Sequence, residues 1–279
     1  FSWFEPGDVS RGEGEVHSIA GMIETLAAAH RLDRARIFVT GLSAGGAMTC
    51  AMLGAYPEIF AAGAAIAGLP YASAANVPEA FQRMGGHGGP GGPSLSDKVR
   101  NASDHQGPWP RLSVWQGSAD HTVAPSNAAA IVEQWRLLHG LAESPSASES
   151  LGPHRRLVWR DAQGRDAIEE YTIAGMGHGT PLDTALLGRA APYMLEVGLS
   201  STLRIAHFFG IVPEAALSET LVEQAQARPE PETATWREVK PGTGPRPQPK
   251  QQEPRPAPQF GGTVRKTIED ALRQAGLMR

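Results

Sequence analysis

The chain is short of three things. Cys50 is its only cysteine among 279 residues, so no disulfide can form within it. No apolar run approaches the roughly 18 residues that a bilayer-spanning helix needs, so we expect no membrane span. Positive charge is not in excess, because 25 basic and 29 acidic residues give a net charge of −4 and a pI near 6.2. This balance disfavours nucleic acid as a partner.

The rest of the composition is typical of a globular protein. Hydrophobic residues make up 41% and charged residues 19%, with a mean hydropathy of −0.26. Glycine and proline are abundant, at 32 and 23 residues, which exceeds ordinary usage. Nine of the prolines lie between Pro229 and Pro258. We therefore expect a globular catalytic domain over 1–217, a mostly disordered proline-rich linker over 218–262 and an amphipathic helix over 263–279.

Within 1–217, stretches with helical and with strand-like patterns alternate. The spacing predicts helices over 16–30, 44–56, 126–139 and 203–209, and strands over 36–40, 61–67, 112–115, 157–160 and 167–173. We expect Ser126 to cap its helix, 85–93 to be a glycine-rich loop, and 70–110 to be an excursion from the core. The two strands around Gly164 form either a hairpin or consecutive extended segments. This alternation predicts an α/β fold with a mainly parallel sheet and helices on both faces.

The motif Gly41-Leu42-Ser43-Ala44-Gly45 matches the G-x-S-x-G pattern of a nucleophile elbow. It follows a predicted buried strand and opens a predicted helix, which is the context the motif requires. A strained turn there would expose the Ser43 hydroxyl, with the glycines relieving steric crowding. The Ala44 backbone N–H would then face a developing oxyanion. The alternative is a glycine-rich turn whose serine has no chemical role.

A serine nucleophile needs a base and an acid that orients the base, in the chain order serine, acid, histidine. Asp120 follows the strand that contains Trp115 and is the best acid, since it falls at the carboxyl end of the sheet. It can also be read as a turn residue bonded to its own backbone. Asp161 and Asp166 flank a predicted tight turn and are weaker candidates.

His178 is the best base, because it lies between two glycines on a loop after a late strand. A solvated loop histidine is the alternative. The other histidines after Asp120 fall next to the acid, at a helix end, in a basic loop or within a helix; they are His121, His139, His154 and His207.

Five blocks of this sequence resemble the polyhydroxybutyrate depolymerase family of esterases, which are α/β-hydrolases related to feruloyl and acetylxylan esterases. The blocks are WFEPGD at 3–8, TGLSAGGAM at 40–48, AGLPY at 67–71, GSAD at 117–120 and GMGHGTP at 175–181, and the resemblance runs from residue 1 to about 211. The segment IEDALR at 268–273 looks like a tail that some members carry. The resemblance implies an α/β-hydrolase fold and the same three residues, Ser43 as nucleophile, Asp120 as acid and His178 as base. It also implies an extracellular or periplasmic location.

The chain departs from this family in one respect. Family members place about four strands before the elbow, one of which ends in a His-Gly pair whose loop supplies a second oxyanion N–H. Only 40 residues precede Gly41 here, and the chain starts at Phe1. We therefore expect a fragment that lacks its first strands, and losing one oxyanion donor typically costs about 2.7–4 kcal/mol of transition-state stabilisation.

The three residues predict a serine hydrolase that acts through an acyl-enzyme, and the resemblance implies a carboxylic-ester hydrolase that cleaves hydroxyalkanoate or related esters, including polyester oligomers. No cofactor or metal is needed. Trp3, Phe4 and Trp115 are candidates for an aromatic wall beside the substrate, although a core role is the more ordinary one. A feruloyl or acetylxylan esterase, a peptidase with the same triad, and a non-catalytic adaptor that binds a protein partner through its proline-rich tail all stay open.

Overall fold

The computed structural model describes residues 1–217. The linker expected over 218–262 and the helix expected over 263–279 lie outside the described residues, so the boundary at residue 217 stays a prediction. The helices are α1 (Pro6–Val9), α2 (Gly14–His30), α3 (Ala44–Ala55), α4 (Val77–Met84), α5 (Gly92–Arg100), α6 (Ser126–His139) and α7 (Ser201–Phe208). The strands are β1 (Phe38–Leu42), β2 (Ala62–Ile66), β3 (Arg111–Gly117), β4 (Ala147–Leu151), β5 (His154–Arg160), β6 (Asp166–Ile173), β7 (Thr180–Leu182) and β8 (Met194–Glu196).

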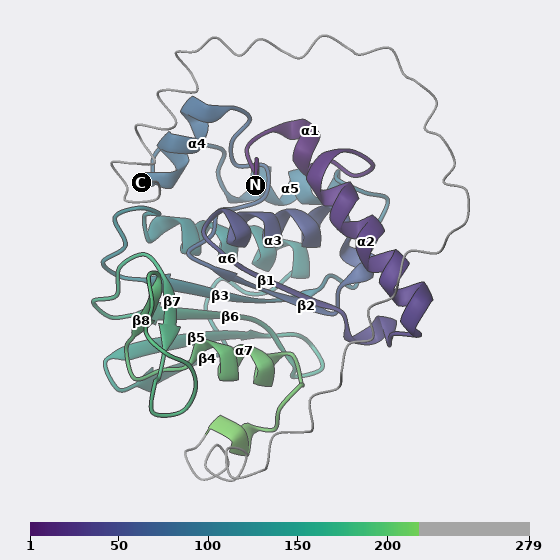
Figure 1. The fold of residues 1–279 in the computed structure, drawn as a ribbon. Coiled ribbons are helices and arrows are strands. Elements are labelled where there is room, and N and C mark those ends of the chain that lie inside the picture. The colour runs from purple at the N-terminus through teal and green to yellow at the C-terminus, as the bar shows by residue number, and fades with distance from the viewer. Residues whose placement is uncertain (218–279) are drawn as a thin grey trace, which may run out of the picture. The chain divides into compact units, whose positions relative to one another are not determined.

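Six strands form one sheet in the order β1-β2-β3-β6-β5-β4 (Figure 1). The pairs β1·β2, β2·β3 and β3·β6 are parallel, whereas β6·β5 and β5·β4 are antiparallel. The sheet is therefore mainly parallel, as the sequence predicted. Among the described residues, the outer side of β1 pairs with no strand, and a groove of about 460 Å³ lined by β1, α2 and α3 runs there.

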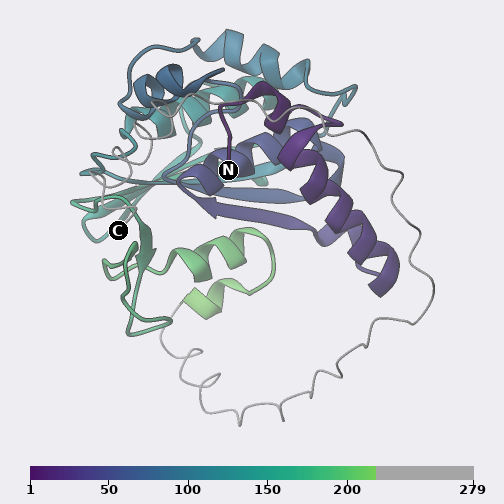
Figure 2. The same ribbon diagram turned by 45° about the horizontal axis from the view of Figure 1, so that its top comes forward.

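Helices cover both faces of the sheet. Helices α2, α3, α5 and α6 lie on one face and α7 on the other (Figures 1 and 2). Leu112 and Val114 of β3 pack toward α3 and α6, while Trp115 of the same strand packs toward α7. This alternation follows from the two-residue period of a strand. None of the helices within 1–217 is long and apolar enough to cross a membrane.

Residues 70–110 contribute buried side chains to the core, which corrects the expected excursion, although the glycine-rich part of this stretch is exposed. This stretch forms α4 and α5, and α5 packs against α6. Leu95 and Val99 of α5 are fully buried, and the buried amide of Gln134 on α6 bonds the Leu95 carbonyl at 3.0 Å. The predicted loop over 85–93 also ends early, because Gly92 and Pro93 open α5. Proline suits the first helical turn, because a backbone N–H there has no acceptor within the helix and proline has no backbone N–H.

Several element boundaries differ from the sequence prediction by one to three residues, whereas helix α6 has the predicted bounds and lacks only the predicted cap. Strand β1 begins at Phe38 rather than at residue 36, because Asp33 caps a 3-10 turn over Arg34–Arg36 by accepting a hydrogen bond from Ala35 N–H. Helix α6 begins at Ser126 itself, with Pro125 in the cap position and no side-chain cap. The expectation that Ser126 caps this helix was therefore wrong.

The C-terminal half of the sheet contains strands that the sequence pattern did not predict. Strands β5 and β6 form the antiparallel hairpin that was one of the two options around Gly164, which has φ +76°. Strand β4 extends this hairpin, and β7 and β8 form a separate parallel pair. Strands β7 and β8 have three residues each, which is too short for a recognisable period.

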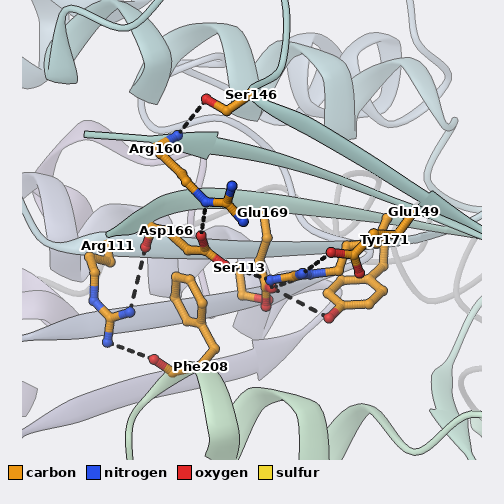
Figure 3. A network of polar contacts seen from close by, with 10 residues as sticks. Arg111, Ser113, Ser146, Glu149, Arg160, Asp166, Glu169, Tyr171 and Phe208 are labelled. Atoms are coloured by element: carbon orange, nitrogen blue, oxygen red, sulfur yellow. Dashed lines mark hydrogen bonds and ion pairs between the residues drawn. The ribbon is translucent and has the colours of Figure 1, made fainter. Parts of the chain in front are cut away.

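The hairpin is fixed by a cluster of charges around Arg156 on the α7 face. Its guanidinium bonds Glu169 at 2.8 Å, Asp166 at 2.8 Å and Glu149 at 2.9 Å. Figure 3 shows the three carboxylates, with Glu169 also accepting from Ser113 at 2.7 Å. Burial raises the pKa of Glu169, while Arg156 and Ser113 oppose that rise. Arg156 therefore stabilises a carboxylate that the fold has removed from water.

Replacing Arg156 with methionine should destabilise the protein by about 3–5 kcal/mol, because Glu169 would be left buried without its counter-charge. The matched control is Arg165→Met, which removes an arginine whose side chain is 66% exposed and which pairs with Asp161. Urea unfolding of both variants tests this. We expect the control to unfold near the wild-type midpoint, and equal losses in the two variants would contradict the assignment.

Candidate active site

Ser43 occupies a strained turn between β1 and α3. Its backbone has φ 59° and ψ −120°, which side-chain-bearing residues rarely adopt. A Cβ on Gly41 would collide with the backbone carbonyl of Gly45, so only glycine fits at that position. A Cβ on Gly45 meets nothing within 4 Å, whereas one on Gly46 would lie 2.8 Å from the Ile66 carbonyl oxygen. The expected crowding therefore acts at Gly41 and Gly46 and not at Gly45.

The first turn of α3 leaves backbone donors beside Ser43. The Ala47 N–H donates to the Ser43 carbonyl at 3.0 Å and closes the first turn. The Ala44 N–H therefore has no acceptor inside the helix. It lies at the positive end of the helix dipole, next to the serine hydroxyl, where an anion would be stabilised.

Three backbone hydrogen bonds join the loops that follow β1, β2, β3 and β6. Ser43 N–H donates to Ile66 O at 2.9 Å, Ala67 N–H to Trp115 O at 2.8 Å, and Ser118 N–H to Ile173 O at 2.9 Å. These bonds continue the parallel ladders past the strand ends. They place the Ser43, Asp120 and His178 segments at the same edge of the sheet.

Asp120 uses both carboxylate oxygens. Oδ1 accepts from the backbone N–H groups of Thr122 and Val123 at 2.8 and 2.9 Å, and Oδ2 accepts from His178 Nδ1 at 2.8 Å. Asp120 therefore has both expected roles, because Oδ1 bonds the backbone of its own turn and Oδ2 bonds the histidine. Burial alone would raise the pKa of Asp120, but the hydrogen bonds from His178 and the two backbone groups outweigh it, so its pKa lies below the usual value.

His178 is held by its own loop and by the Asp120 loop. Ala119 N–H donates to the Met176 carbonyl at 3.0 Å, and a Cβ on Gly117 would lie 2.6 Å from the Gly177 carbonyl oxygen. The His178 ring also meets the Tyr193 ring edge to face at 6.2 Å. Three of the other histidines bond a backbone carbonyl group, whereas His178 bonds the Asp120 carboxylate. His139 bonds Pro110, His154 bonds Val197 and His207 bonds Val212.

Within the described residues, the Ser43 hydroxyl makes no hydrogen bond. The bond between Asp120 and His178 is present, whereas a bond between Ser43 and His178 is not. Such contacts often tighten only when substrate binds.

Cys50 does not compete as a nucleophile, because it is buried and burial raises the pKa of its thiol to about 12. Within 1–217, no group of three or more His, Cys, Asp or Glu side chains is arranged so that it could hold a metal ion.

The candidate aromatic wall does not hold for its two tryptophans. Trp115 is fully buried and stacks on Tyr171 at 3.7 Å on the α7 face. Trp3 is buried in a cluster with Ala47, Leu69 and Val123. Neither ring offers surface to a substrate, because both complete the core. Phe4 is half-buried against Trp3 and is the one member of the three that keeps accessible surface.

Gln116 contacts Asp120 and was not singled out from the sequence. Its amide nitrogen lies 3.1 Å from Asp120 Oδ2, and its side chain is on the same face of β3 as Leu112 and Val114. A polar residue at an apolar-facing position of a buried strand is the signal that could have identified it.

The variants Gly41→Ala and Gly45→Ala test the strained turn as a matched pair. A methyl group at position 41 cannot avoid the Gly45 carbonyl, so this variant should lose several kcal/mol of stability or fail to fold. The same methyl at position 45 enters open space. Thermal unfolding compares the two, and a Gly41→Ala protein as stable as Gly45→Ala would refute the geometry of the turn.

Comparisons with known proteins agree on one family. The family model described as "Esterase PHB depolymerase" matches residues 1–159. A poly(3-hydroxyalkanoate) depolymerase C of Paucimonas lemoignei is 42% identical over 217 residues, covering 76% of this chain and 52% of that protein. An acetylxylan esterase of Coprinopsis cinerea is 31% identical over 191 residues, covering 63% of this chain and 46% of that protein.

The chain spans about half the length of these curated relatives. Among solved structures, an acetyl xylan esterase from Aspergillus awamori superposes with a TM-score of 0.62 at 22% identity, covering 75% of this chain and 72% of that one. That likeness shows the fold. The family model and the 42% identical relative show that the chain belongs to the PHB depolymerase family of esterases, and the superposition shows that it has an α/β-hydrolase fold.

Proposed function

We propose that this chain carries the catalytic triad of a serine carboxylic-ester hydrolase, with Ser43 as nucleophile, His178 as base and Asp120 as the acid that orients it. One observation carries the proposal: a 2.8 Å bond joins Asp120 Oδ2 to His178 Nδ1 at the sheet edge where Ser43 sits in its strained turn. With Nδ1 donating to the carboxylate, the free Nε2 is the atom that can accept the serine proton.

The reaction follows from this arrangement. His178 Nε2 removes the proton as Ser43 Oγ attacks the ester carbonyl carbon, and the carbonyl oxygen becomes an oxyanion near the Ala44 N–H. The tetrahedral intermediate expels the alcohol, which takes the proton back from His178. Water then attacks the acyl-enzyme with His178 again as base, releasing the acid and free Ser43. Asp120 keeps its negative charge throughout and stabilises the imidazolium.

The substrate class rests on the relatives. The 42% identity to a poly(3-hydroxyalkanoate) depolymerase exceeds the 28–31% found for a feruloyl esterase B of Talaromyces funiculosus and the acetylxylan esterase of Coprinopsis cinerea. We therefore assign hydroxyalkanoate esters, including polyester oligomers, as substrates, and feruloyl or acetyl-sugar esters as the main alternative. A partner for the proline-rich tail concerns residues outside the described part of the chain.

The oxyanion site is expected to need a second donor. In this chain the Ala44 N–H is the donor that the elbow supplies, and one missing donor typically lowers kcat by about 10²–10³. Among the described residues, the unpaired side of β1 and its groove lie next to the elbow.

Hydrolysis of p-nitrophenyl butyrate tests the nucleophile. Ser43→Ala should lower kcat/KM by about 10³-fold or more, because no other group can form the acyl-enzyme. The matched control is Ser18→Ala, since Ser18 is exposed on α2 and bonds only its own helix. Full turnover by Ser43→Ala would remove the nucleophile assignment.

A parallel assay of hydroxybutyrate oligomers, methyl ferulate and acetylated xylan ranks the substrate classes. The proposal predicts the highest kcat/KM for the oligomers. A preference for ferulate or acetyl esters would keep the triad and replace the substrate.

A further inference from the structure

Gln116 is a buried polar residue that contacts the Asp120 carboxylate. It is the next-to-last residue of β3, and 3% of its surface is exposed. The amide nitrogen Nε2 lies 3.1 Å from Asp120 Oδ2, 3.1 Å from the Val123 carbonyl oxygen and 3.3 Å from the Gly117 carbonyl oxygen. Its two protons therefore go to the two nearer acceptors, one of which is the Asp120 carboxylate.

Asp120 Oδ2 consequently accepts two hydrogen bonds, one from Gln116 and one from His178. Oδ1 is already saturated by the Thr122 and Val123 backbone groups. Gln116 and His178 are thus the two side chains that share the same carboxylate oxygen. A change in either bond must alter the charge available to the other.

The carbonyl oxygen of the Gln116 side chain, Oε1, indicates that this glutamine does more than fill space in the core. Within the described residues its Oε1 is buried without a hydrogen-bond partner. A buried acceptor left unsatisfied typically costs about 1–3 kcal/mol. A methionine of similar size would avoid that cost, so a requirement at Nε2 would account for the glutamine.

We propose that Gln116 is a positioning residue for the esterase reaction, which orients Asp120 Oδ2 and moderates its negative charge so that His178 keeps a free base nitrogen. This inference rests on the proposed function. A neutral donor on a carboxylate stabilises the ionised form and weakens it as a proton acceptor. Without that donor, Oδ2 carries more charge toward the imidazolium and is held in place by one bond fewer.

The test compares two buried glutamines. Gln116→Met should move the acidic limb of the kcat/KM profile to higher pH, because the imidazolium form is then favoured by a more charged carboxylate. It should also lower kcat about 10-fold with little change in KM, because Gln116 orients the base without touching substrate. Gln134→Met is the matched control, since that buried amide bonds the backbone of Tyr71 and Leu95 and neither Asp120 nor His178. It should lower the unfolding midpoint and leave the acidic limb in place.

A Gln116→Met protein that folds and keeps the wild-type acidic limb would overturn the proposal, as would an equal shift in Gln134→Met. A second measurement needs no variant. In a pH titration of the wild-type protein followed by NMR, the Gln116 side-chain amide signals should move with the same midpoint as the His178 ring signals.

Amide signals that stay fixed while His178 titrates would overturn the positioning role even if no variant folds. The titration also separates the two ideas. Coupled signals in a protein that hydrolyses no ester would keep the Gln116–Asp120–His178 linkage and reject the esterase assignment.

Discussion

The parallel alignment of β1, β2, β3 and β6 is the constraint on which the site depends. Parallel strands end at one edge, and three backbone hydrogen bonds carry the alignment past the strands, from Ser43 to Ile66, from Ala67 to Trp115 and from Ser118 to Ile173. Each loop begins where its strand ends, so the loops start at the same edge of the sheet. Ser43, Asp120 and His178 come from distant parts of the sequence, and this ladder is what gathers them.

Close backbone contacts and buried hydrogen bonds then fix each group. Gly41 allows the strained Ser43 turn because a Cβ there would strike the Gly45 carbonyl. Asp120 is fully enclosed and fully bonded, which keeps it ionised despite burial. On the opposite face, Arg156 holds the β5–β6 hairpin through Glu169. Strand β6, which Arg156 holds through Glu169, leads directly into the His178 loop.

Sequence alone could predict what depends on local pattern. The elbow motif, the strand before Asp120 and the glycines around His178 are all local signals, and the structure places these three segments at one edge. Gln116 was missed because β3 is buried on both faces, so the strand pattern does not show that this amide contacts Asp120. The roles of Trp3 and Trp115 could not be decided, since burial is set by distant partners such as Tyr171. Strands β7 and β8 are defined by their pairing with each other and not by their own sequence.

The central claim is that Ser43 is an activated nucleophile at the edge of this sheet. The most direct measurement is covalent labelling with a fluorophosphonate ester, followed by peptide mapping by mass spectrometry. The account predicts a single phosphonylated residue, Ser43, with labelling that is lost in Asp120→Asn because His178 is no longer correctly oriented. Labelling at another residue, or none at Ser43 in a form that hydrolyses esters, would contradict it.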